Sequence, residues 1–250
     1  MSEANITLPG FNIISDVKGV LSGVRMSLAG NQWFVIDELI KFLKSMGGFN
    51  VYVETIPPGL VLRRALGEPP LVIGGLVIDV KPEIVSLPTS MLNGLTVKDK
   101  FDYVENDLAI VYVGEPVNDW CELRNRRVAI PNPVTEGIGV LFRELYTEYC
   151  GDYSEFIGRG SVYLTRIHHR EIPELLRNGL IDAGGVVWRT EAIYWGGFKY
   201  TVPIRNRVSR LSFALMPWAG NDAVKVFELL RSDDVRRMYE KYGFKWIAKP

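Results

Sequence analysis

The chain has 250 residues, of which 47% are hydrophobic, so it has enough apolar side chains for one large domain or two smaller lobes. Lys plus Arg and Asp plus Glu both number 29, and the formal net charge is zero. This balance gives no electrostatic case for nucleic acid or an acidic membrane surface as a partner. No stretch reaches the roughly 18 apolar residues that a membrane-inserted helix needs, so membrane insertion is not expected.

The beginning of the chain and its cysteines give no sign of export. The first residues, MSEANITLPGFNIISDVKG, lack a basic start followed by a long apolar run. As written, the chain is expected to work in the cytoplasm, unless a native signal has been removed. Cys121 and Cys150 are too few for a disulfide framework and have no second Cys or His at metal-ligand spacing. We expect two structural thiols, with one disulfide as the alternative.

Hydrophobic periodicity and turn residues in the first part of the chain predict alternating strands and helices. Residues 1–22 read as an irregular arm. Strands are predicted at 24–28, 51–56 and 71–78, and helices at 33–46 and 60–66. This order requires a parallel sheet with right-handed crossovers.

After a loop that ends near residue 107, a second unit of the same kind is predicted. Its strands are expected at 108–113, 127–130 and 183–188, and its helices at 139–149 and from about residue 171 to 178. The chain then returns through a strand at 208–216 and closes with two helices. We therefore predict an α/β fold with two lobes, residues 1–107 plus 204–250 and residues 108–203, joined by two crossings.

Both histidines of the chain lie in one run, His168-His169-Arg170, just before a predicted helix start. A helix N-terminus carries free N–H groups and partial positive charge, and imidazole and guanidinium groups add further donors. The run therefore predicts an anion site. A solvated turn with structural histidines is the alternative reading.

Four predicted turns follow strands, at residues 29–32, 57–60, 132–139 and 167–170. In open parallel sheets, ligands bind beyond the carboxyl ends of strands, where turns lead into helices. Two turns belong to each lobe, so a cleft between the lobes would collect all four, and hinge closure would exclude water from the ligand.

Five segments in register resemble one family over about residues 24–248. They are VRMSLAGNQWFVIDELIKFL, IPPGLVLRRALGEPPLVIGG, RVAIPNPVTEGIGVLFREL, GLIDAGGVVWRTEA and VRRMYEKYGF. Together they resemble the periplasmic molybdate- and tungstate-binding proteins of ABC transporters, with the His-His-Arg run marking a divergent member. The resemblance implies a type II periplasmic-binding fold and an oxyanion held by hydroxyls, backbone N–H groups and a tyrosine.

The chain departs from this family at the expected ligand positions. Asn31 replaces the first-turn hydroxyl, residues 58–60 are Pro-Gly-Leu at the second turn, and Trp188 stands at the tyrosine position. Asn and Trp still donate hydrogen bonds, but their reach and shape argue against a tetrahedral molybdate cage. Glu136 falls near a position where archaeal tungstate binders of this family use acidic side chains.

The candidate ligand contacts are donors, acceptors or turn formers at these strand ends. They are Gly30, Asn31, Gly59, Leu60, Thr135, Glu136, Gly137, Ile138, His168, His169, Arg170 and Trp188. Structural alternatives remain: a helix cap for Asn31, a solvated carboxylate for Glu136, turn formation for Thr135 and Gly137, and core packing for Trp188.

Neither a metal site nor an enzyme is expected. Adjacent His168 and His169 point in opposite directions in an extended turn, and one of them with Glu136 would make only a two-ligand site. The sequence lacks a nucleophile elbow, a Cys–His pairing, a phosphate loop and a dinucleotide fingerprint.

The sequence therefore predicts a monomeric binding protein without a cofactor. It would capture a small oxyanion or acidic metabolite for an ABC-transporter permease. The alternatives are an intracellular sensor that uses the same cleft and an enzyme built on this fold.

Overall fold

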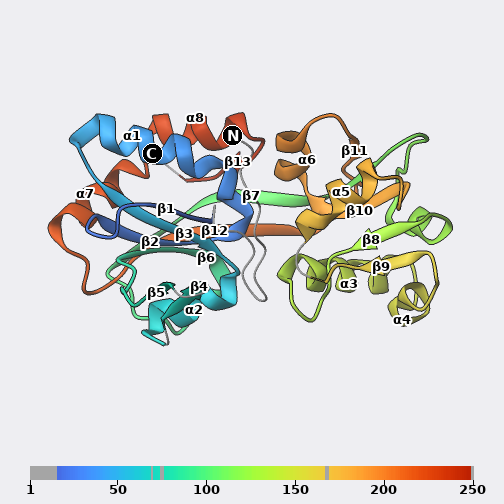
Figure 1. Cartoon of the computed structure of the whole chain (residues 1–250), viewed down its shortest axis with the longest axis horizontal. Helices are drawn as coiled ribbons and strands as arrows, with labels where there is room; N and C mark the ends of the chain where they lie inside the picture. The colour runs from blue at the N-terminus through green and yellow to red at the C-terminus, as the bar shows by residue number, and fades with distance from the viewer. Residues whose placement is uncertain (1–15, 69, 74–75, 167–168, 249–250) are drawn as a thin grey trace. The chain divides into compact units, whose positions relative to one another are not determined.

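The computed structural model describes residues 16–68, 70–73, 76–166 and 169–248. The chain forms two compact units: unit 1 comprises residues 1–105 and 210–250, and unit 2 comprises residues 106–209. Two strands, β7 (Asp99–Tyr112) and β12 (Val208–Leu215), carry the chain from one unit to the other (Figure 1).

The sheet of unit 1 mixes parallel and antiparallel pairs. Its strands follow the order β1 (Val17–Gly19), β3 (Val51–Ile56), β2 (Val24–Ala29), β6 (Ile84–Pro88), β12 and β7, and β13 (Lys245–Trp246) pairs with β7. β2 is parallel to both β3 and β6, whereas β1 and β12 are antiparallel to their neighbours β3 and β6. The carboxyl ends of β2 and β3 therefore lie at the same edge.

Helices cover both faces of this sheet. On one face lie α1 (Ile36–Gly47), α7 (Asn221–Leu229) and α8 (Asp233–Lys241), with α1 and α8 side by side (Figure 1). Apolar residues of α1 recur at helical spacing, Leu39 and Leu43 are buried, and Gly48 ends the helix with a left-handed φ of 67°. On the other face, α2 (Pro58–Leu66) packs through Val61 and Ala65.

Unit 2 repeats this plan with a smaller sheet. Its strands follow the order β7, β10 (Ala183–Trp188), β8 (Val128–Ile130) and β9 (Val162–Leu164), and β11 (Lys199–Thr201) pairs with β7. One face packs against α3 (Gly137–Tyr149) and α4 (Tyr153–Ile157), and the other against α5 (Ile172–Arg177) and α6 (Arg189–Trp195). Each apolar face of the sheet is thus buried by its own helix pair.

The sequence prediction was wrong at three places in unit 1. The apolar run at 71–78 is not a single strand: β4 (Leu71–Ile73) and β5 (Leu76–Ile78) form a separate antiparallel hairpin. The third main strand is instead β6, which was read as loop. The described end of the expected irregular arm also contains a strand, β1, because its backbone pairs with the edge of β3. Short elements, among them α4, β9, α6 and β11, were missed.

The two cysteines are joined, contrary to the expectation of two thiols. Cys121 and Cys150 form a disulfide across 29 positions of sequence, with their Cα atoms 5.1 Å apart. Cys121 lies in the 3-10 segment η4 (Trp120–Asn125), which Asp119 caps by accepting a hydrogen bond from the Cys121 N–H at 2.9 Å. Cys150 ends α3. The packing of these two elements, which no sequence pattern displays, brings the sulfurs together.

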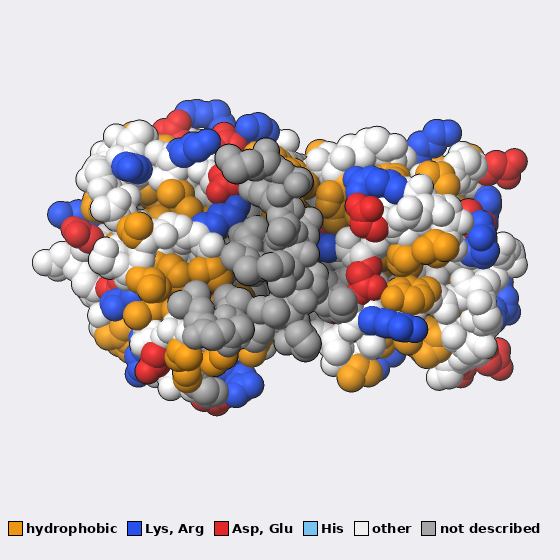
Figure 2. Space-filling view, in the orientation of Figure 1, with side chains coloured by type: hydrophobic (Ala, Val, Ile, Leu, Met, Phe, Trp, Pro, Cys, Tyr) orange, Lys and Arg blue, Asp and Glu red, His pale blue; other side chains and the backbone are white. Residues whose placement is uncertain are grey.

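Charged side chains of both signs are interspersed on the face shown in Figure 2, in keeping with the neutral composition. Within the described ranges, the helices are too short or too polar for any of them to cross a membrane.

Candidate ligand-binding site

Three segments of unit 2 leave its sheet at the same edge. β8 is parallel to both β9 and β10, with Val128 aligned with Val162 on one side and Ala183 on the other. The loops after β8 and β9 lead into α3 and α5, and α6 begins directly after β10. Because ligands in open α/β sheets bind beyond the carboxyl ends of parallel strands, this edge is the candidate site of unit 2.

A buried ion-pair network, which we call the clamp, joins the segments that follow β8, β9 and β10 through Glu136, His169 and Glu191. His169 Nδ1 lies 2.5 Å from Glu136 Oε2, and His169 Nε2 lies 2.8 Å from Glu191 Oε2. Glu136 follows β8, His169 follows β9 and Glu191 follows β10. The side chains of Glu136, His169 and Glu191 are 8%, 5% and 0% exposed. The clamp thus fixes these segments to one another away from water.

The geometry favours a doubly protonated His169. A neutral imidazole has one N–H, whereas both ring nitrogens of His169 face carboxylate oxygens. Burial lowers the pKa of His169, but the Glu191 and Glu136 carboxylates outweigh burial and raise its pKa from 6.5 to about 9. The clamp therefore holds one imidazolium between two carboxylates at neutral pH.

Glu136 receives further hydrogen bonds that hold its side chain in place. The Thr165 hydroxyl donates to Glu136 Oε1 at 2.6 Å, and the backbone N–H of His169 donates to Glu136 Oε2 at 2.9 Å. Burial raises the pKa of Glu136, but the His169 charge and these hydrogen bonds outweigh it and hold the pKa below its usual range. The Asn132 N–H also donates to the Thr165 hydroxyl, at 3.0 Å. These three hydrogen bonds join the loops after β8 and β9, in addition to the clamp.

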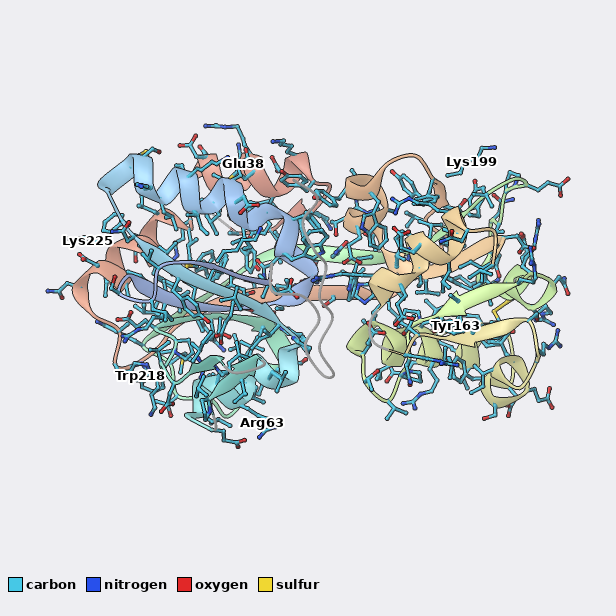
Figure 3. The ribbon with its side chains drawn as sticks, in the orientation of Figure 1. Glu38, Arg63, Tyr163, Lys199, Trp218 and Lys225 are labelled. Atoms are coloured by element: carbon cyan, nitrogen blue, oxygen red, sulfur yellow. A yellow bond between two sulfur atoms is a disulfide. The ribbon has the colours of Figure 1, made fainter. Side chains whose placement is uncertain are left out.

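The loop after β9 is also held by its own strand. Tyr163 of β9, labelled in Figure 3, donates from its hydroxyl to Glu171 Oε2 at 2.9 Å. Glu171 Oε1 accepts the Arg166 N–H at 3.1 Å. Glu171 ends the short 3-10 segment η5 (His169–Glu171), so these bonds fix the backbone that carries His169 and Arg170.

The N-terminus of α3 lies at the same edge. Glu136 occupies the N-cap position, yet its side chain makes no capping hydrogen bond, because the clamp holds the carboxylate. Gly139 allows the first turn of α3 to approach the preceding loop, since a Cβ at this position would lie 2.4 Å from the Pro131 carbonyl oxygen. Among the described residues, the N-cap side chain therefore leaves the backbone N–H groups of Gly137 and Ile138, at the start of the helix, without a capping bond.

In unit 1, the turn after β2 is the 3-10 segment η2 (Gly30–Val35), anchored by a buried polar network around Gln32. Gln32 Oε1 accepts the hydroxyls of Tyr103 at 2.9 Å and Tyr239 at 2.6 Å, and Gln32 Nε2 donates to the Ser86 hydroxyl at 3.1 Å. All four side chains are fully buried. The network fixes the backbone next to Asn31.

The candidate contacts of unit 1 differ in whether their polar groups already have hydrogen-bond partners. Asn31 Oδ1 is buried and has no hydrogen-bond partner in the described part of the chain. At the start of α2, the Leu60 N–H donates to the Pro57 carbonyl at 2.8 Å, so this amide is already used within the first turn. Gly59 is exposed with open space around it. Of these three residues, Asn31 is thus the best placed to form a hydrogen bond with a ligand.

The structure brings together Glu136 and His169 from the predicted contacts, with Arg170 next to them in η5. Thr135 is an exposed turn residue whose N–H donates to the Asn132 carbonyl. Trp188 is 7% exposed and packs in the apolar core below the sheet edge. His168 lies outside the described residues. Ligand contact by each candidate stays a prediction.

Sequence reasoning missed three residues that organise these loops: Thr165, Glu191 and Gln32. Glu191 carried one usable signal, because it is an acidic residue placed three positions after the end of a buried strand. Gln32 was named only as part of a turn. Residue type and spacing do not show that the partners of these three residues lie on other segments of the chain.

Comparison with known proteins decides the family. A model of the family described as bacterial extracellular solute-binding protein matches residues 25–245. The chain belongs to this family. A comparison of the sequence with curated proteins found no match.

The fold of this solute-binding protein is similar to several solved structures. The periplasmic molybdate-binding protein of Azotobacter vinelandii has 12% identity and a TM-score of 0.70, covering 91% of this chain and 100% of its own. The sulfate-binding protein SubI of Mycobacterium tuberculosis has 15% identity and a TM-score of 0.65, covering 90% and 86%. The CcmR regulatory domain of Synechocystis, in complex with 2-PG, has 12% identity and a TM-score of 0.59, covering 83% and 94%. These likenesses confirm the predicted type II periplasmic-binding fold class.

Proposed function

We propose that this solute-binding protein captures a small oxyanion or acidic metabolite and delivers it unchanged to an ABC-transporter permease. The observation that carries the proposal is the uncapped N-terminus of α3, set among three segments that the clamp holds at one sheet edge. Helix N-termini attract anions through free N–H groups and the helix dipole. The names of two structural neighbours, a molybdate-binding and a sulfate-binding protein, support an anionic ligand.

In this proposal, unit 2 supplies the amides of Gly137 and Ile138 and the charge of Arg170. The ligand is held by hydrogen bonds and charge alone, so no bond is made or broken.

The disulfide supports work outside the cytoplasm. Disulfides persist in oxidising compartments and are rare where thiols are kept reduced. The Cys121–Cys150 bond therefore favours the transport role over an intracellular sensor. The sensor remains the second candidate, because a regulatory domain shares this fold.

A thermal-shift screen tests the ligand class. The panel comprises molybdate, tungstate, sulfate, phosphate and small carboxylates, with NaCl at matched ionic strength as the control. A ligand that binds only the folded state raises the Tm as its concentration rises above Kd. We expect at least one anion to raise the Tm in a saturable way, and Arg170→Ala to reduce that shift. No shift with any member would overturn the proposal.

Thiol labelling of cell fractions separates the transporter component from the sensor. Full-length protein would be precipitated with acid, denatured and treated with a maleimide before and after reduction. The transport role predicts protein outside the cytoplasm that reacts only after reduction. Cytoplasmic protein whose two thiols react without reduction would favour the sensor.

A further inference from the structure

Glu136 carries a negative charge at the very place where the proposed function needs an anion to bind. It is the N-cap residue of α3, and its pKa is held below the usual range. An ionised carboxylate at a helix start is itself attracted by the free N–H groups and repels a second anion. A site for an acidic ligand therefore requires that this charge be offset and turned aside.

We propose that His169 is a positioning residue that holds the Glu136 carboxylate away from the α3 amides and offsets part of its charge, so that an acidic ligand can use those amides. This inference rests on the proposed function and assigns His169 a role through Glu136 instead of ligand contact. The Glu136 side chain makes no capping bond to α3, and its Oε2 atom instead accepts both the ring Nδ1–H and the backbone N–H of His169.

Burial and hydrogen bonding argue against direct ligand contact by His169. The residue is 4% exposed, and both ring nitrogens lie within hydrogen-bonding distance of carboxylate oxygens. Glu191, which is fully buried, fixes the far side of the ring at Nε2. A ligand could reach a ring nitrogen only by displacing one of these carboxylates. The imidazolium therefore acts on its neighbours and not on the ligand.

Loss of His169 changes the start of α3 in a defined way. Without the imidazolium, Glu136 keeps its hydrogen bonds from the Thr165 hydroxyl and the backbone N–H at position 169. Its charge is then offset less and repels an incoming anion more strongly at the same helix end. If this is the role of His169, removal of the Glu136 charge must restore binding in a chain that lacks the imidazole.

A charge-rescue cycle tests this role by calorimetry at neutral pH, with inorganic sulfate and inorganic phosphate as probes. His169→Ala is expected to weaken binding of whichever probe binds the unmodified protein by about tenfold or more, an effect of about 1.4 kcal/mol. Glu136→Gln alone is expected to strengthen binding, because it removes a negative charge. The double variant is expected to recover most of the affinity that His169→Ala loses. Glu144→Gln, an exposed charge further along α3, is the matched control and should leave the affinity unchanged.

The outcomes separate this inference from the proposed function. If the unmodified protein and His169→Ala bind the probe with equal affinity, the role of His169 is overturned and the proposed function is not. A loss in His169→Ala that Glu136→Gln does not relieve would also overturn it, because that result fits direct contact or a purely structural role. Binding of neither probe by the unmodified protein would count against the anion site itself.

A second variant covers the case in which His169→Ala does not fold. The triple variant Glu136→Gln, His169→Gln, Glu191→Gln keeps amide hydrogen-bonding groups at all three positions and removes all three charges. The inference expects it to bind the probe at least as tightly as the unmodified protein. A weaker affinity in the folded triple variant, checked by circular dichroism, would overturn the inference.

Discussion

Gln32 and Tyr239 lie 207 positions apart in the sequence and share a buried hydrogen bond of 2.6 Å in the core of unit 1. Gln32 directly follows Asn31 in η2, and Tyr239 lies on α8, near the end of the chain. A neutral polar network thus connects the proposed ligand loop of unit 1 to β6, β7 and α8.

Replacement of Gln32 tests how much this network stabilises unit 1. Gln32→Leu leaves the hydroxyls of Tyr103, Tyr239 and Ser86 without their shared partner, so we expect the free energy of unfolding to fall by about 3 kcal/mol. Tyr239→Phe removes one hydrogen bond and should cost about 1 kcal/mol. Denaturant unfolding measures both values. Equal effects of the two variants would show that Gln32 is not the centre of the network.

Gly139 provides a test of the packing at the start of α3. Gly139→Ala places a Cβ 2.4 Å from the Pro131 carbonyl oxygen, so the loop or the helix must shift, and we expect a loss of about 1–3 kcal/mol in unfolding free energy. Gly137→Ala is the matched stability control, because its Cβ would meet open space and alanine favours helix by about 0.5–1 kcal/mol. A lower Tm for Gly137→Ala than for Gly139→Ala in thermal unfolding would contradict this packing.

The disulfide of unit 2 should contribute measurably to stability. It closes a loop of 29 positions, for which the loss of chain entropy in the unfolded state corresponds to about 3 kcal/mol. Cys121→Ser with Cys150→Ser, or a reducing agent acting on the unmodified protein, should lower the free energy of unfolding by this amount. Addition of reductant to the double serine variant is the control and should have no effect.

The clamp predicts a specific dependence of stability on alkaline pH. The pKa of His169 is about 9 in the folded chain, against its ordinary value of 6.5, so the folded state binds the proton more tightly. Its stabilisation is complete below pH 6.5 and is lost as pH rises through about 9. We expect the free energy of unfolding to fall between pH 7 and 9 in the unmodified protein and to fall much less in His169→Gln. If the free energy of unfolding falls equally with pH in the unmodified protein and in His169→Gln, the raised pKa of His169 is contradicted.

The sequence predicted the elements whose pattern is long and regular. Strands near residues 24–28, 51–56 and 183–188 are β-branched or apolar runs bounded by turns, and the structure confirms each within one residue. The helix that contains Leu39 and Leu43 shows the i, i+3, i+4, i+7 spacing of one buried face. Such local patterns survive because tertiary packing reinforces them.

The elements that were missed depend on pairing with distant segments. The run at 71–78 is apolar on both sides of a Gly-Gly pair and was predicted as one strand, but its two halves pair with each other, and β6 takes the place beside β2. The disulfide depends on the packing of η4 against the end of α3. Neither the hairpin nor the disulfide follows from residue type, because each depends on contacts between segments.

The candidate site was predicted in part, for the same reason. Glu136 and His169 were selected because each follows a predicted strand, and parallel pairing of β8 and β9 does place them together. Glu191 was not selected, since only the register of β10 beside β8 shows that it meets the imidazole. Because Glu191 is its partner, the role of His169 also changes. It was expected to donate a hydrogen bond to the anion, and it is now proposed as a positioning residue.

Amide chemical shifts during an anion titration test the central claim most directly. In a ¹⁵N-labelled sample of the full chain titrated with the anion that gives the largest thermal shift, the backbone N–H signals of Gly137 and Ile138 should show large, saturable changes. The Gly151 signal, which follows the other end of α3, should move little. Saturable binding that leaves both Gly137 and Ile138 unchanged would contradict an anion site at the start of α3.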